Sequence, residues 1–148
     1  MYEPNEIDEL IERFPRLFRG KRLASRCFLP AGWVPQVHEL FEDLNELLSD
    51  TDAPQFQIRQ IKEKLGGLRV YWWLGPPRLG PDDDGRDARD WYWPELHDRL
   101  DARIRAAEVE CESICQECGA GAAVRQGRSL NKLCAACWAL RTATGQPG

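Results

Sequence analysis

Four cysteines near the C-terminal end of this chain form two pairs, each with two residues between its members. The first pair is Cys115 and Cys118, the second is Cys134 and Cys137, and fifteen residues separate the pairs. This spacing is typical of a structural zinc site. Each short loop holds two thiolates about one edge of a metal–sulfur tetrahedron apart, and two loops complete a closed tetrahedron with no open position for chemistry. The sequence therefore predicts a structural Zn²⁺ bound by these four cysteines.

Disulfide or redox chemistry is the alternative interpretation of the same four cysteines. Residues 1–10 are acidic and contain no apolar stretch, so they do not resemble a secretory signal, and we expect a cytoplasmic protein. Thiols stay reduced in the cytosol, where paired cysteine motifs bind metal more often than they form disulfides. Cys27 and Cys111 lie outside the pattern and are expected to pack as small apolar residues, although Cys111, one helical turn before Cys115, is also an alternative ligand.

The residues around the cysteines predict the form of the metal-binding unit. A short strand is expected at 129–132, and a helix is expected to begin just after the second cysteine pair, where its free N–H groups and positive dipole end would stabilise thiolates. This order predicts a treble-clef or ribbon-like zinc finger over residues 111–141. Residues 142–148 are expected to form a disordered tail.

Apolar residues recur at helical spacing in three segments before the cysteines. These segments are 6–14, 35–48 and 94–111. Pro15 is expected to end the first helix, and residues 15–30 to form a basic connector. The inner face of the third helix is expected to consist of Leu96, Leu100, Ile104, Ala107 and Cys111.

Segment 56–73 carries the pattern of a β-hairpin. Leu68, Val70 and Trp72 alternate with their neighbours, as in a strand with two different faces. Gly66 and Gly67 are suited to the positive φ angles of a tight turn. A helix through segment 58–65 is the alternative. The next segment, 75–90, is rich in Pro, Gly and Asp and is expected to be a flexible loop.

These elements predict an α+β fold in which amphipathic helices pack on a small antiparallel hairpin. Residues 1–110 would form this domain, and the four-cysteine finger would pack on it. A chain of 148 residues has the usual length of one domain with a small appended module. No run of about 18 apolar residues occurs, which excludes a transmembrane helix.

The block from Gln60 to Tyr71, with its Lys64-Leu65-Gly66-Gly67-Leu68-Arg69 core, stands between Gly32-Trp33 and the two cysteine pairs. In this order the motifs resemble a group of small proteins of bacteria, phages and prophages that combine such a block with a zinc finger. The resemblance covers Gly32 to Cys137. It implies a phage or prophage accessory protein, and it implies no activity that can be transferred residue by residue.

Tryptophans and acidic residues support protein binding as the first functional hypothesis, with the chain acting as a zinc-stabilised adaptor or inhibitor. Residues 31–110 carry an excess of acidic side chains, and the chain has six tryptophans. Aromatic residues are enriched at interface centres, and acidity can mimic nucleic acid against a basic partner. The expected surface consists of Trp72, Trp73, Trp91 and Trp93. The same rings are equally expected to fill a small core.

Nucleic-acid binding by the finger is the alternative. The basic residues of the finger are Arg125, Arg128, Lys132 and Arg141, and Lys64 or Arg69 would add to them from the hairpin. A zinc ion bound by four thiolates has a net charge of about −2, so these cations are also suited to neutralising the metal site. The sequence pI of about 5.3 argues against coating of nucleic acid by bulk charge.

A metal-dependent nuclease is the third hypothesis. The chain has two histidines, His38 and His97, and neither lies in a recognisable nucleophile or metalloprotease motif. The sequence therefore predicts no catalytic residue.

Overall fold

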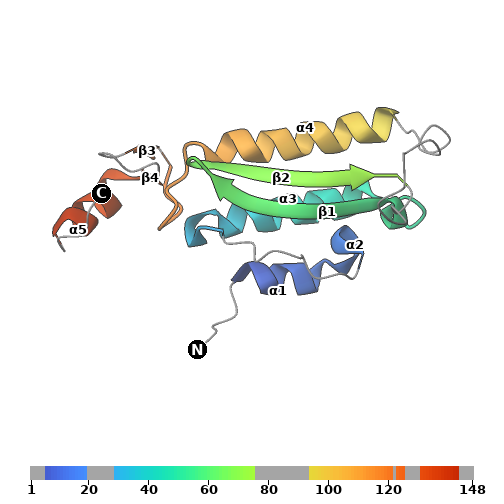
Figure 1. Ribbon diagram of the computed structural model, residues 1–148, viewed down its shortest axis with the longest axis horizontal. Coiled ribbons are helices and arrows are strands. Elements are labelled where there is room, and N and C mark those ends of the chain that lie inside the picture. Colours follow the sequence, from blue (N-terminus) through green and yellow to red (C-terminus); the bar gives the residue numbers. More distant parts are fainter. Residues whose placement is uncertain (1–5, 20–28, 76–93, 122, 126–130, 144–148) are drawn as a thin grey trace, which may run out of the picture.

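The computed structural model describes residues 6–19, 29–75, 94–121, 123–125 and 131–143. An α-helical and hairpin body occupies most of the molecule, and a small C-terminal unit lies at one end of it (Figure 1). The predicted α+β class is confirmed. Among the described residues, no helix combines the length and the apolar character needed to cross a lipid bilayer.

Helices α3 (Val34–Leu47) and α4 (Pro94–Cys111) pack against each other and follow the predicted segments closely. Pro35 lies in the first turn of α3, where its missing N–H costs no hydrogen bond. A short 3₁₀ helix, Ala31–Trp33, leads into α3. The predicted inner face of α4 is buried at Leu100, Ile104, Ala107 and Cys111, and Leu96 is half-buried. Helical periodicity therefore located both helices and identified the core face of α4.

The N-terminal segment differs from the expected connector. Helix α1 (Glu6–Arg13) ends before Pro15, as predicted, but Pro15 then begins a second short helix, α2 (Pro15–Phe18). Proline suits this first helical position, and α2 buries Leu17 and Phe18 completely. The basic residues in and after α2 are structural: an Arg16 Nη atom donates to Asn45 Oδ1 at 3.0 Å, and an Arg19 Nη atom donates to the Gly75 carbonyl oxygen at 2.9 Å.

Strands β1 (Phe56–Lys64) and β2 (Gly67–Leu74) form the predicted antiparallel hairpin, so the helical alternative is wrong. A 3₁₀ turn, Ala53–Gln55, precedes β1. The turn lies one residue earlier than expected: Leu65 and Gly66 occupy it with φ angles of 54° and 84°, and Gly67 pairs with Lys64 as the first residue of β2. A two-residue hairpin loop with positive φ at both positions matches the right-handed twist of the strands. The pairing register shifts between Ile58 and Gln60, where Arg59 forms a bulge.

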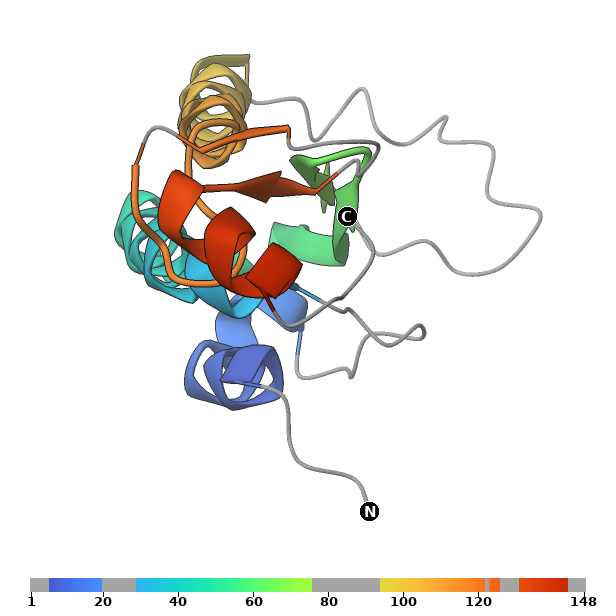
Figure 2. The same cartoon turned by 90° about the vertical axis from the view of Figure 1, so that its left-hand side faces the viewer.

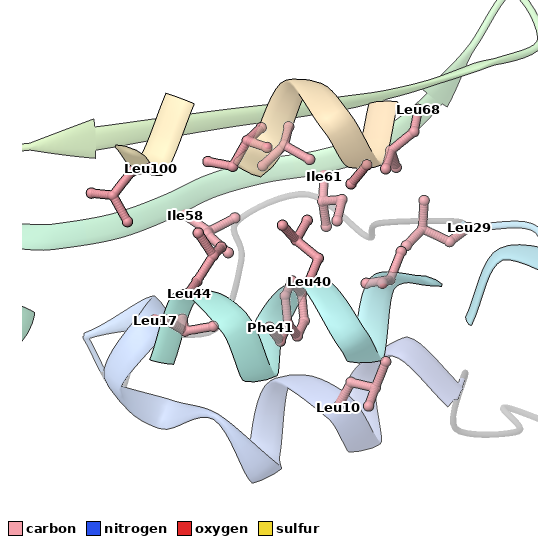
Figure 3. Packing of buried hydrophobic residues seen from close by; sticks show 14 of the residues in the cluster. Leu10, Leu17, Leu29, Leu40, Phe41, Leu44, Ile58, Ile61, Leu68 and Leu100 are labelled. Atoms are coloured by element: carbon pink, nitrogen blue, oxygen red, sulfur yellow. The ribbon is translucent and has the colours of Figure 1, made fainter. Parts of the chain in front are cut away.

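The helices cover one side of the hairpin. Figure 2 looks along the hairpin, with α3 and α4 on one side of its strands. Helix α4 packs along β2, and α2 packs against β1. Figure 3 shows the side chains that fill the space between these layers, among them Leu40, Ile58 and Leu100. The hairpin therefore has one buried face and one face that turns away from the core.

Candidate metal centre

The C-terminal unit begins where α4 ends. Strands β3 (Val124–Arg125) and β4 (Lys132–Leu133) form a short antiparallel pair, and helix α5 (Ala135–Ala143) follows. The expected strand at 129–132 is represented by β4, and residues 126–130 lie outside the described residues. Helix α5 ends two residues inside the expected tail, and residues 144–148 are outside the described part. The first cysteine loop, a short strand pair and a helix thus follow one another in the predicted order.

Backbone hydrogen bonds shape the first cysteine loop. The Gly119 N–H donates to the Cys115 carbonyl at 3.0 Å, and the Cys115 N–H donates to the Ala120 carbonyl at 2.8 Å. Gly119 has a φ of +82°, which glycine adopts without steric cost. The second loop lies at the start of α5: Cys134 directly precedes the helix, and the Cys137 N–H donates to the Cys134 sulfur at 3.4 Å. Backbone groups therefore hold both loops in the shape that presents their thiols.

The four predicted ligands come together in one cluster. The Sγ atoms of Cys115, Cys118, Cys134 and Cys137 all lie within 4.8 Å of one another. The Sγ atoms of Cys118 and Cys134 are 3.6 Å apart. With Zn–S bonds of about 2.3 Å, tetrahedral coordination places sulfurs about 3.8 Å apart, so the cluster has the dimensions of a tetrahedral thiolate site. The five described cysteines are all free thiols, which speaks against the disulfide interpretation.

The thiols in this cluster differ in how readily they ionise. Burial raises the pKa of the Cys115 thiol, but hydrogen bonds from the Cys118, Cys134 and Glu117 backbone together outweigh it and lower the pKa to about 6. Burial, followed by hydrogen bonds with the other three thiols, raises the pKa of Cys137 above its ordinary value. One thiolate therefore forms easily and makes further ionisation costly. A bound dication would remove this cost, because metal ligation deprotonates thiols outright.

Cys111 is separate from the metal cluster. Its side chain is fully buried in the body, among the core residues of α4, and it does not belong to the four-cysteine group. Burial, and to a smaller extent the charge of Glu110, raises the pKa of the Cys111 thiol to about 12. The packing role predicted for this residue is confirmed. Cys27 lies outside the described residues.

Neither histidine approaches the cysteines as a ligand. His38 on α3 pairs with Glu42 one turn later, with His38 Nε2 3.0 Å from Glu42 Oε1. His97 on α4 packs its ring against Trp72, with the ring centroids 4.9 Å apart. Both therefore have surface or packing contacts away from the cysteine cluster.

The first cysteine loop is attached to the start of α3. The Gly32 N–H donates to the Gln116 carbonyl at 2.8 Å, and the Trp33 indole N–H donates to the Ile114 carbonyl at 3.1 Å. A Cβ atom on Gly32 would lie 2.0 Å from the Cys115 carbonyl oxygen, so only glycine fits at this approach. The sequence singles out Gly32 and Trp33 only as part of a resemblance, and it does not predict their contact with the cysteine loop. A Gly-Trp pair far from the cysteines gives no local signal of this role.

The basic residues of the finger do not form one open surface among the described residues. Arg141 on α5 makes an ion pair with Glu117, and both side chains line a cleft of about 360 Å³ between the finger and the hairpin tip. Lys132 is half-buried in β4. The backbone of Arg125 pairs with Lys132, and Arg128 lies outside the described residues.

The predicted tryptophan surface is divided by the hairpin. Trp72 and Trp73 are consecutive residues of β2, so their side chains lie on opposite faces. Trp72 packs against the core, with its ring centroid 5.8 Å from that of Phe56, whereas Trp73 lies on the other face under the Arg59 guanidinium. Trp91 and Trp93 are outside the described residues. The two described rings therefore do not form one patch.

Comparison of the chain with protein-family models, with curated proteins and with solved structures finds no match.

Proposed function

We propose that this chain is a zinc-stabilised binding protein in which Cys115, Cys118, Cys134 and Cys137 bind one Zn²⁺. The observation that carries the proposal is the convergence of four thiol sulfurs within 4.8 Å from two separate loops. A set of four thiolates is soft and strongly favours zinc over magnesium or calcium, which take oxygen ligands. The chemistry of the donor atoms thus supports zinc and argues against the hard cations.

The proposed role of the metal is structural. Four cysteines fill a tetrahedral site, so no coordination position remains for water or substrate. The ion would join the loop that follows α4 to the first turn of α5. Only four described residues make up the buried apolar cluster of the finger, Cys115, Ala123, Leu133 and Cys137, and two of these are themselves ligands. A unit with so small a core depends on its metal for stability.

A protein-binding adaptor or inhibitor role, in a phage or prophage setting, stays a prediction from the sequence. Its expected surface relied on a group of tryptophans, and the division of Trp72 from Trp73 weakens that argument. Zinc binding does not depend on it.

Elemental analysis of the purified chain tests the proposal directly. We expect about one zinc per chain, and Co²⁺ in its place should show the intense charge-transfer absorption of a tetrahedral thiolate site. Cys118→Ser should lose metal, because Cys118 is exposed and its replacement removes a ligand without disturbing a core. Cys111→Ala is the matched control: it removes a thiol four residues from the site and should keep the metal. Freshly reduced protein that contains no metal and takes up none would refute the proposal.

A further inference from the structure

One face of the β1–β2 hairpin turns away from the helices and has a distinctive composition. The pairing register places Lys62 opposite Arg69, and Lys64 opposite Gly67, at outward positions. Tyr71 and Trp73 follow Arg69 at alternate positions of β2, and Arg59 lies at the bulge of β1. We call this set the outer hairpin face; it consists of Arg59, Lys62, Lys64, Arg69, Tyr71 and Trp73.

The side chains of the outer hairpin face are more exposed than those of the inner face. Ile58, Ile61 and Leu68 on the inward positions are fully buried against the helices. On the outward positions Arg59, Lys64 and Arg69 are exposed, Tyr71 is 44% exposed, and Lys62 and Trp73 are half-buried. An exposed tyrosine beside a tryptophan on a strand that has already filled its core face is not needed for packing.

The charge of the hairpin is opposite to that of the chain. Four basic residues lie on the outer hairpin face, whereas the chain as a whole has a formal net charge of −4. Glu63 is the one acidic residue of the two strands, and it lies at an inward position of β1, opposite Leu68. Its Oε1 accepts a hydrogen bond from the Gly66 N–H at 2.7 Å. A concentration of positive charge in an acidic protein favours a polyanionic partner at this place.

The rings and the cations are arranged in pairs. The Arg59 guanidinium lies 5.2 Å from the centre of the Trp73 ring, and the Lys62 ammonium lies 5.5 Å from the centre of the Tyr71 ring. Alternate residues of a strand are about 7 Å apart on one face. A base that stacks on either ring would therefore bring its own phosphate close to a lysine or arginine. Repetition of a ring and a cation along one strand is the arrangement by which sequence-tolerant proteins hold unpaired nucleotides.

We propose that the outer hairpin face binds single-stranded nucleic acid. Tyr71 and Trp73 stack on successive bases, and Arg59, Lys62, Lys64 and Arg69 pair with phosphates. Unpaired strands are favoured over duplex because only unstacked bases offer a face to an aromatic ring. The rings also favour nucleic acid over an acidic protein, for which cations alone would suffice. This site lies on the hairpin and goes beyond the proposed zinc centre.

Fluorescence anisotropy with the full-length, zinc-loaded chain tests this site. The probes are a labelled oligothymidylate, longer than the roughly 4–16 nucleotides that one small domain covers, and a duplex of the same length. We expect tighter binding of the single strand and an affinity that falls between about 50 and 200 mM salt. Each neutralised phosphate contributes about −0.7 to the slope of log K against log salt, so four cations give a slope of roughly −3.

Two sets of variants separate stacking from charge. Tyr71→Leu removes the ring and should weaken binding of the single strand roughly 5- to 150-fold. Tyr71→Phe keeps the ring and should bind the single strand as tightly as the unchanged protein. Lys62→Gln with Arg69→Gln should reduce the salt slope by about 1.4. The matched control is Arg99→Gln with Arg105→Gln, which removes two charges from exposed positions of α4 and should change binding far less.

Zinc content and thermal melting of every variant show that the fold is intact, and they separate failure of this proposal from failure of the zinc site. The proposal is overturned if the intact protein does not bind the single strand at low salt, if it prefers the duplex, or if the α4 control weakens binding as much as the hairpin variants. The proposal is also overturned if the protein binds dextran sulfate as tightly as the single strand, and if this binding is lost in Lys62→Gln with Arg69→Gln but kept in Tyr71→Leu. That result would indicate an acidic protein as the partner.

Discussion

The indole N–H of Trp33 donates a hydrogen bond to the carbonyl oxygen of Ile114 at 3.1 Å. This bond joins the start of α3 to the residue that precedes the first cysteine of the metal cluster. The Trp33 side chain is fully buried, so water cannot replace either partner of this hydrogen bond. The contact connects two segments that are eighty-one positions apart in the sequence and makes the finger part of the same folded unit as the body.

Trp33→Phe should therefore destabilise the protein even though it keeps an aromatic ring. The Ile114 carbonyl would lose a buried donor, which costs about 1–3 kcal/mol. Urea denaturation of the zinc-loaded protein measures the loss. Tyr71→Phe on the exposed hairpin face is the control and should change the free energy of unfolding by less than about 0.5 kcal/mol. Equal stability of both variants would show that the Trp33 bond contributes nothing.

Gly32→Ala should weaken the attachment of the finger more severely. The new Cβ would lie 2.0 Å from the Cys115 carbonyl oxygen and 2.8 Å from the Gly119 nitrogen, so backbone must move. Overpacking of this kind costs about 1–3 kcal/mol and here should reach or exceed the upper value. Gly121→Ala provides a matched comparison, because a Cβ there meets no atom within 4 Å. Differential scanning calorimetry should show a lower melting temperature only for Gly32→Ala.

Acid should release the metal. Zinc binds thiolates, so protons compete with it, and the affinity falls as the pH falls. Backbone hydrogen bonds lower the pKa of the Cys115 thiol to about 6, so even this ligand is protonated in acid. We expect zinc to be retained at neutral pH and to dissociate as the pH is lowered through the acidic range, measured with a zinc-sensitive dye. Cys111→Ala should release zinc over the same pH range. Release that does not depend on pH would contradict ligation by these thiols.

Alkali should destabilise the body through Cys111. Its pKa is raised by burial from 9.0 to about 12, so folding favours the neutral thiol. A raised pKa of this kind contributes stability that is complete below about pH 9 and is lost as the pH rises from about 9 to 12. The loss amounts to about 1.4 kcal/mol per pH unit in that range. Cys111→Ala should remove this part of the slope when urea denaturation is measured from about pH 8 to 11. Identical slopes for both proteins would count against the buried thiol.

Local patterns in the sequence were sufficient for the elements and for the ligand set. The spacing of the two cysteine pairs led to Cys115, Cys118, Cys134 and Cys137, which the structure brings together. Helical periodicity located α3 and α4, and alternation located the hairpin. Each of these signals repeats within a few residues, because it reflects the geometry of a single turn, helix or strand.

Other features were decided only by the tertiary structure. The sequence could not show that Gly32 and Trp33 contact the first cysteine loop, since that contact joins distant segments. It also could not show which helices cover the hairpin, or that Trp72 packs on the core while Trp73 lies beside Arg59. The alternation favours Leu68 and Val70 as the buried face, but it does not say which distant segments bury it. Packing of the helices on that face leaves Arg69 and Tyr71 exposed on the other.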